Sequence, residues 1–165
     1  MHKLERLAPP GYPIGRERSI FLLGAALAFL YSLFFFSSFN NALDALYQHV
    51  GRKRILIPGA TMPDFKVLLG SFLSGFYVLA GLSVLLAALH YSYFYQESKS
   101  IYLMKRLSNP WELHLRCWTL PILGALCSLL LAFLVLLLYF AIYMIATPEP
   151  CLTPDQWLKL WSELL

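Results

Sequence analysis

The sequence predicts an all-α protein that crosses a membrane three times. Of its 165 residues, 59% are hydrophobic and 13% are charged, whereas a typical soluble domain has about 45–50% apolar and about 25% charged residues. The apolar residues gather in three blocks, and each block is long enough for the helix of about 20 residues that crosses a bilayer. These observations favour a polytopic membrane protein and argue against a soluble enzyme.

The first block, 19–39, contains no charged residue and no proline, and it predicts the first span. The preceding segment, 1–18, is basic and proline-rich, and we expect it to be a cytoplasmic lead-in. A cleaved signal peptide is the alternative. We reject it because the apolar run exceeds the usual core of about 7–15 residues and no small-residue cleavage site follows cleanly.

The second and third blocks, 67–95 and 119–147, predict the other two spans of a 19–147 membrane domain. Pro121 is expected in the first turn of the third span, where a missing N–H costs little. The second block has small residues at helical spacing: Gly70, Ser71, Ser74, Gly75 and Gly81. Such residues let membrane helices approach closely, although glycine is common in membrane helices in any case.

The segment between the first two blocks offers less. Asn40 or Asn41 is expected to cap a short helical turn, and 54–59 reads as an extended strip closed by a turn. It could form a docking lid over the spans or lie on the lipid headgroups, and we prefer the second interpretation.

The basic residues predict an orientation. Eight Lys and Arg residues lie on the side shared by the N-terminus and the second loop, and five lie on the other side. The positive-inside rule therefore favours a cytoplasmic N-terminus and an external C-terminus. The basic cluster 52–54 lies on the side that this orientation places outside. It either contacts lipid headgroups or is evidence against this topology. The net charge of +4 does not require binding to nucleic acid, because anionic lipid headgroups beside the spans account for it.

No residue pattern indicates catalysis, a cofactor or a metal. The chain has no Walker-type loop, and its cysteines have no metal spacing or disulfide pattern: Cys117, Cys127 and Cys151. Among the histidines, His90 alone lies inside a span. It could be a functional buried group or an interfacial residue among tyrosines, and we prefer the second interpretation. We expect a protein that is not an enzyme.

The segment 97–116 is the most informative. Its first part can form a short amphipathic helix on the cytoplasmic surface, which 108–110 would break. Asn109 is a plausible N-cap for a second helix, with Pro110 at the first position and Glu112 in the first turn. That second helix would continue into the third span.

This order of elements resembles the first half of a type-2 ABC exporter permease. The resemblance implies a coupling helix that binds an ATP-binding-cassette ATPase subunit, and the matching residues are Glu97, Ile101, Leu103, Met104, Leu107, Pro110 and Glu112. The chain departs from the family at Lys99 and Ser100, which replace a Gly-Thr pair, and at Ser108, which stands at the usual proline position. A complete permease of this family also has twice as many spans.

The resemblance implies a permease-like subunit. We expect it in the bacterial cytoplasmic membrane, with which the lack of a signal peptide and of a disulfide set is compatible. We expect it to pair with a second membrane protein or with another copy of itself. The alternative is a small non-catalytic scaffold or regulatory subunit of a larger membrane complex.

The tail, 152–165, is expected to form an amphipathic helix. Thr153, Pro154 and Gln156 have the composition of a capping box. An apolar stripe follows that includes Trp157 and Trp161. A helix too short to span should lie in the membrane interface with its tryptophans at headgroup depth, or else pack on a partner.

Overall fold

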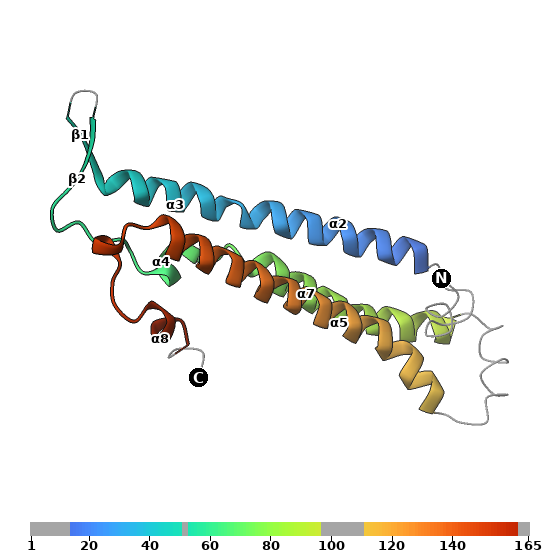
Figure 1. Cartoon of the computed structure of the whole chain (residues 1–165). Helices are drawn as coiled ribbons and strands as arrows, with labels where there is room; N and C mark the ends of the chain where they lie inside the picture. Colours follow the sequence, from blue (N-terminus) through green and yellow to red (C-terminus); the bar gives the residue numbers. More distant parts are fainter. Residues whose placement is uncertain (1–13, 51–52, 97–110, 162–165) are drawn as a thin grey trace. The chain divides into compact units, whose positions relative to one another are not determined.

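A computed structural model describes residues 14–50, 53–96 and 111–161 (Figure 1). The chain divides into two compact units, which are described separately. The first unit combines Met1–Ala28 with Gly75–Ala132, and the second combines Phe29–Ser74 with Phe133–Leu165.

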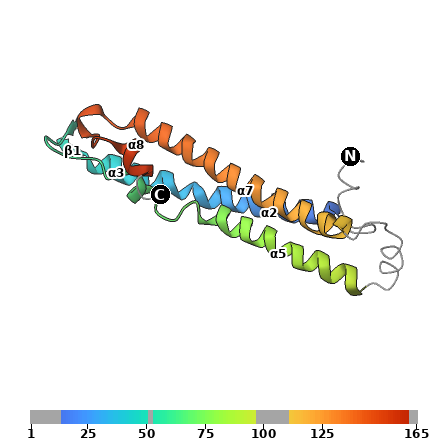
Figure 2. The same cartoon turned by 90° about the horizontal axis from the view of Figure 1, so that it is seen from below.

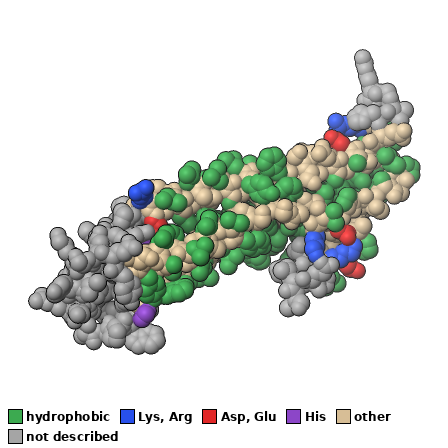
Figure 3. Space-filling view, turned by 180° about the vertical axis from the view of Figure 1, so that it is seen from behind, with side chains coloured by type: hydrophobic (Ala, Val, Ile, Leu, Met, Phe, Trp, Pro, Cys, Tyr) green, Lys and Arg blue, Asp and Glu red, His purple; other side chains and the backbone are tan. Residues whose placement is uncertain are grey.

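Among the described residues, three helical stretches are long and apolar enough to cross a membrane: Gly15–Ala45, Ser74–Ser92 and Cys117–Ala146. The prediction of a mostly helical chain with three apolar helices is confirmed. On the face seen in Figure 3, hydrophobic side chains extend along the helices, and charged side chains gather near helix ends. Many large apolar side chains are exposed, as expected where lipid rather than water is the solvent.

The first unit contains most of α2 (Ile14–Ser32), α5 (Ser74–Gln96) and the first part of α7 (Trp111–Ala146). Figure 2 shows α2, α5 and α7 as long helices that run in similar directions. Small residues allow close approach here, since a Cβ atom on Gly75 would lie 3.1 Å from the Cα atom of Ala28. Ser128 on α7 donates a hydrogen bond to the carbonyl oxygen of Phe76 at 2.7 Å.

The second unit holds the shorter elements, which are α3 (Phe34–Ala45), β1 (Tyr47–Val50), β2 (Lys53–Leu56), α4 (Phe65–Leu69), η1 (Glu149–Cys151) and α8 (Gln156–Trp161). Its core is aromatic. The rings of Phe35 and Tyr139 stack with centroids 4.6 Å apart, and Phe65 packs edge-on against Phe35 and Tyr143. The Tyr143 hydroxyl donates to the carbonyl oxygen of Pro63 at 3.0 Å, so this core also holds the entry to α4.

The segment after the first span differs in part from the prediction. Asn40 and Asn41 lie inside α3 and cap nothing, because the helix continues to Ala45. The chain then forms an antiparallel hairpin in which Tyr47 lies opposite Leu56. The all-α prediction is therefore wrong for 47–50 and 53–56, where strand pairing satisfies backbone groups that a loop would leave to solvent. The expected extended strip at 54–59 agrees with β2 and with the turn at Gly59.

The helix boundaries also differ. The second span was expected to begin at 67, but α4 ends at Leu69 and α5 begins at Ser74. Between them, Gly70 has a φ of 45°, which favours glycine. The third helix begins at Trp111, so Pro121 lies in its interior and not in its first turn. In the tail, α8 begins at Gln156, not after Thr153, because Asp155 has a φ of 60°.

Candidate functional site

Most of the predicted coupling residues lie outside the described residues: Glu97, Ile101, Leu103, Met104, Leu107 and Pro110. Glu112 is the second residue of α7. Helix α7 is described from Trp111 and continues without interruption through Ala146. Asn109 and Pro110, the expected N-cap and first residue of this helix, lie outside the described residues. The described helices α5 and α7 therefore flank the 97–110 segment on both sides.

The side chain of His90, on α5, is fully buried and contacts both other long helices of the first unit. Its Nε2 atom lies 3.2 Å from Oε2 of Glu17 on α2. Its Nδ1 atom lies 3.1 Å from the backbone carbonyl oxygen of Cys117 on α7. One imidazole thus joins α2, α5 and α7 near the ends of α5 and α7 that flank 97–110.

Pro121 explains why a side chain can bond to the carbonyl of Cys117. In an uninterrupted helix the amide of residue 121 would donate to the carbonyl of residue 117, but proline has no N–H. Pro121 lies inside α7, so that carbonyl lacks its helical donor. The imidazole of His90 supplies the missing donor and satisfies a polar group that would otherwise be costly to bury.

The two bonds together fix how many protons the site holds. A carbonyl oxygen can only accept, so Nδ1 of His90 must carry a hydrogen. A bond between Nε2 and Glu17 then needs one more proton, carried either by the imidazole as a cation or by the carboxyl as a neutral acid. Without that proton, a ring lone pair would face a carboxylate at a site where the Glu17 side chain is only 14% exposed.

A second contact between α5 and α7 lies near the first. The indole Nε1 of Trp118 donates to the hydroxyl oxygen of Tyr91 at 3.1 Å. The Tyr91 hydroxyl hydrogen can then be donated to Nδ1 of His114, 2.6 Å away. The ends of α5 and α7 that flank 97–110 are therefore linked twice. The buried His90 side chain makes one link, and the exposed contacts of Tyr91 make the other.

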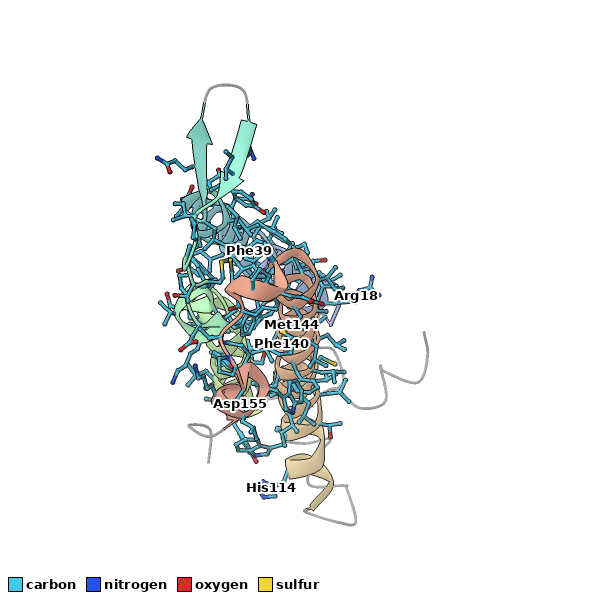
Figure 4. All side chains as sticks on the ribbon, turned by 60° about the vertical axis from the view of Figure 1, so that its left-hand side comes forward. Arg18, Phe39, His114, Phe140, Met144 and Asp155 are labelled. Atoms are coloured by element: carbon cyan, nitrogen blue, oxygen red, sulfur yellow. The ribbon has the colours of Figure 1, made fainter. Side chains whose placement is uncertain are left out.

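A groove of about 190 Å³ lies beside the His90 site in the first unit. Its walls come from all three helices: Glu17, Arg18, Phe21, Ser83, Leu86, Leu120, Pro121, Leu123, Gly124 and Cys127. Almost all of this surface is apolar. Arg18 is exposed, and Figure 4 shows its side chain pointing away from the helices.

In the second unit, the Asp64 carboxylate holds the tail. The Thr153 hydroxyl and the side-chain amide of Gln156 each donate a hydrogen bond to Oδ1 of Asp64 at 2.8 Å. Nζ of Lys159 lies 3.1 Å from the same oxygen. The backbone amide of Phe65 donates to Oε1 of Gln156 at 3.1 Å. These donors, Gln156 foremost, hold the pKa of Asp64 below its ordinary value.

The predicted interfacial tryptophans belong to this tail. Trp161 ends α8, and Trp157 is half-exposed with its ring centroid 5.3 Å from that of Phe140 on α7. Figure 4 shows Phe140 and Met144 of α7 close to the tail that carries Asp155. The tail therefore docks on its own chain, an arrangement that was not among the expected ones.

Sequence reasoning did not single out Glu17, and it favoured an interfacial role for His90. A usable signal was present, because successive membrane helices alternate in direction. Glu17 at the start of the first span, His90 at the end of the second and Cys117 at the start of the third therefore belong to the same end. Within the described residues, no group of three or more His, Cys, Asp or Glu side chains could hold a metal ion. Comparison of the chain with protein-family models, curated proteins and solved structures finds no match.

Proposed function

We propose that this chain is a permease-like membrane subunit of an ABC-type transporter, on which an ATPase subunit acts through residues 97–116. The observation that carries the proposal is the contact among Glu17, His90 and Cys117. It joins three apolar helices close to the segment on which the ATPase would act.

The spacing along the chain supports this role. His90 precedes the end of α5 at Gln96 by six residues, and Cys117 follows the start of α7 at Trp111 by six residues. Both helices that flank the segment therefore meet α2 through one imidazole. A displacement of the segment would move α5 and α7 together and would reach α2 through Glu17.

The length of α7 supports the same role. Its 36 residues, at about 1.5 Å per residue, give roughly 54 Å, whereas the hydrocarbon core of a bilayer is about 30 Å thick. One continuous helix is thus long enough to cross the bilayer and to extend beyond it toward 97–110. Three helices cannot enclose a wide path, so transport requires a second membrane subunit or a second copy of the chain.

The proposed orientation has the N-terminus and 97–116 in the cytoplasm of a bacterial cell, where the ATPase would be. The test places a photoreactive amino acid at Leu103 in the full chain, in its native membrane. We expect a cross-link to an ATP-binding-cassette ATPase. The matched control carries the same group at Leu158, an exposed residue of α8, and should give no ATPase cross-link.

A double substitution, Leu103→Asp with Leu107→Asp, should abolish co-purification of the ATPase, whereas Leu158→Asp should preserve it. If no ATPase is cross-linked from 103, or if both substituted chains retain it equally, the coupling role is wrong. The chain would then be a scaffold or regulatory subunit of a membrane complex that lacks such an ATPase.

A further inference from the structure

The groove beside His90 has one charged group whose bonding capacity is not already used. Glu17 is engaged by His90, and the Ser83 hydroxyl donates to the carbonyl oxygen of Leu79 at 2.8 Å. The structure gives Arg18 no ion pair within residues 14–50, 53–96 and 111–161. The groove thus combines apolar walls with an available guanidinium.

One end of the groove lies near the polar ends of the helices, and the other end lies deeper among their apolar segments. Arg18 is the last charged residue before the uncharged run 19–39, so its guanidinium is at the level where headgroups meet hydrocarbon. From there the lining continues along α2 to Phe21 and along α7 to Cys127, deeper into the apolar segments. The cationic end is therefore the interfacial end.

Gly124 helps to keep the groove open. A Cβ atom at this position would lie 3.3 Å from Oγ of Ser83 and 3.7 Å from the ring of Phe21. A larger residue at 124 would fill space between α2, α5 and α7. The absence of a side chain here leaves room for a narrow apolar ligand.

We propose that this groove binds an acyl chain of an anionic phospholipid, whose phosphate is held by Arg18. Guanidinium and phosphate form paired, charge-assisted hydrogen bonds. The His90–Glu17 pair carries one shared proton and is neutral overall, so Arg18 gives the mouth of the groove a net positive charge. A headgroup with a net negative charge is preferred over a zwitterionic one. The proposal does not depend on the transport role.

The test uses the full chain, purified in detergent, and phosphatidylglycerol with a photoreactive group in its acyl chain. Adducts should map to the groove residues of α5 and α7. Arg18→Gln should weaken labelling about tenfold, the loss expected when a charge-assisted hydrogen bond is removed. Arg16→Gln is the matched control, because Arg16 is exposed on the same turn but does not line the groove, and its labelling should be unchanged.

A second pair of variants tests the apolar part of the groove. Leu123→Trp places a large ring in the groove and should prevent labelling, whereas Leu126→Trp alters an exposed residue outside it and should not. Unlabelled phosphatidylglycerol should compete more strongly than phosphatidylcholine. Circular dichroism and gel filtration verify that each variant is folded.

Labelling spread evenly over the helices, or an equal loss in the Arg16 and Arg18 variants, would overturn the proposal. It would also be overturned if, in native membranes, a photoreactive residue at position 123 cross-linked to a protein segment and not to lipid. The groove would in that case be an interface with a partner helix.

Discussion

Nδ1 of His90 lies 3.1 Å from the carbonyl oxygen of Cys117, where an uninterrupted helix would place the amide of residue 121. A side chain on α5 thus completes the backbone hydrogen bonding of α7. Because the same imidazole also contacts Glu17, one residue serves both the backbone of one helix and the carboxyl group of another.

The dependence of His90 on Pro121 can be measured with a double-mutant cycle. His90→Ala leaves the Cys117 carbonyl and Glu17 without this partner, and should lower the free energy of unfolding by about 1–3 kcal/mol. In a Pro121→Ala background, a restored amide can donate to Cys117, so the same change should cost about 1 kcal/mol less. Equilibrium unfolding in mixed detergent micelles measures both costs, and equal values would show that Pro121 and His90 are not coupled.

The shared proton between His90 and Glu17 predicts different outcomes for two substitutions. Glu17→Gln keeps an N–H group that can donate to Nε2 of a neutral imidazole, so it should cost less than about 1 kcal/mol. Glu17→Ala leaves a buried ring nitrogen without this partner and should cost about 1–3 kcal/mol. Thermal unfolding in detergent compares the variants, with the exposed Glu149→Ala as the control. Equal destabilisation by the glutamine and the alanine substitution would contradict this account of the proton.

Two glycines of α5 should respond to alanine in opposite directions. At Gly75, the added methyl would lie 3.1 Å from both Cα and Cβ of Ala28, so α2 and α5 must move apart. At Gly81, nothing lies within 4 Å of the added methyl, and alanine should stabilise the helix by up to about 1 kcal/mol. Gly75→Ala should therefore lower the melting temperature while Gly81→Ala raises it, and stabilisation by both changes would contradict the close packing at Gly75.

Acid should release the tail from Asp64. The bonds from Gln156, Thr153 and Lys159 lower the pKa of Asp64 in the folded state, so they stabilise docking above the unfolded value of about 3.9. That contribution is lost as the pH falls through the lowered pKa. Hydrogen exchange of 156–161 should accelerate over this acidic range. In Asp64→Asn, exchange should already be faster at pH 7 and should change little with acid, whereas Glu149→Gln should behave as the unmodified chain does.

Sequence alone predicted the features that depend on local composition. Three uncharged apolar runs indicated the three helices that are long and apolar enough to cross a membrane. The Gly70 break was not anticipated, because uncharged and mainly apolar residues continue on both sides of it. Its φ of 45° shows that a single glycine can redirect the chain within an uncharged block.

The candidate site was harder to predict because its parts are far apart in sequence. Glu17 and His90 are separated by 73 positions, and their contact depends on how two helices are rotated about their axes. Gln156 and Asp64 are separated by 92 positions in the sequence. Their contact requires the Asp64 side chain to bond to the tail and not to its own helix. Composition predicted an amphipathic tail, but it did not indicate what that tail would contact.

The proline inside α7 also limits how related chains can diverge. A descendant that replaces Pro121 with any residue bearing an amide hydrogen would regain the backbone bond to residue 117, and selection on position 90 for a donor at that carbonyl would relax. A descendant that keeps the proline must keep a hydrogen-bond donor at 90. Positions 90 and 121 should therefore co-vary among relatives, and Glu17 should be retained only in lineages that retain the imidazole.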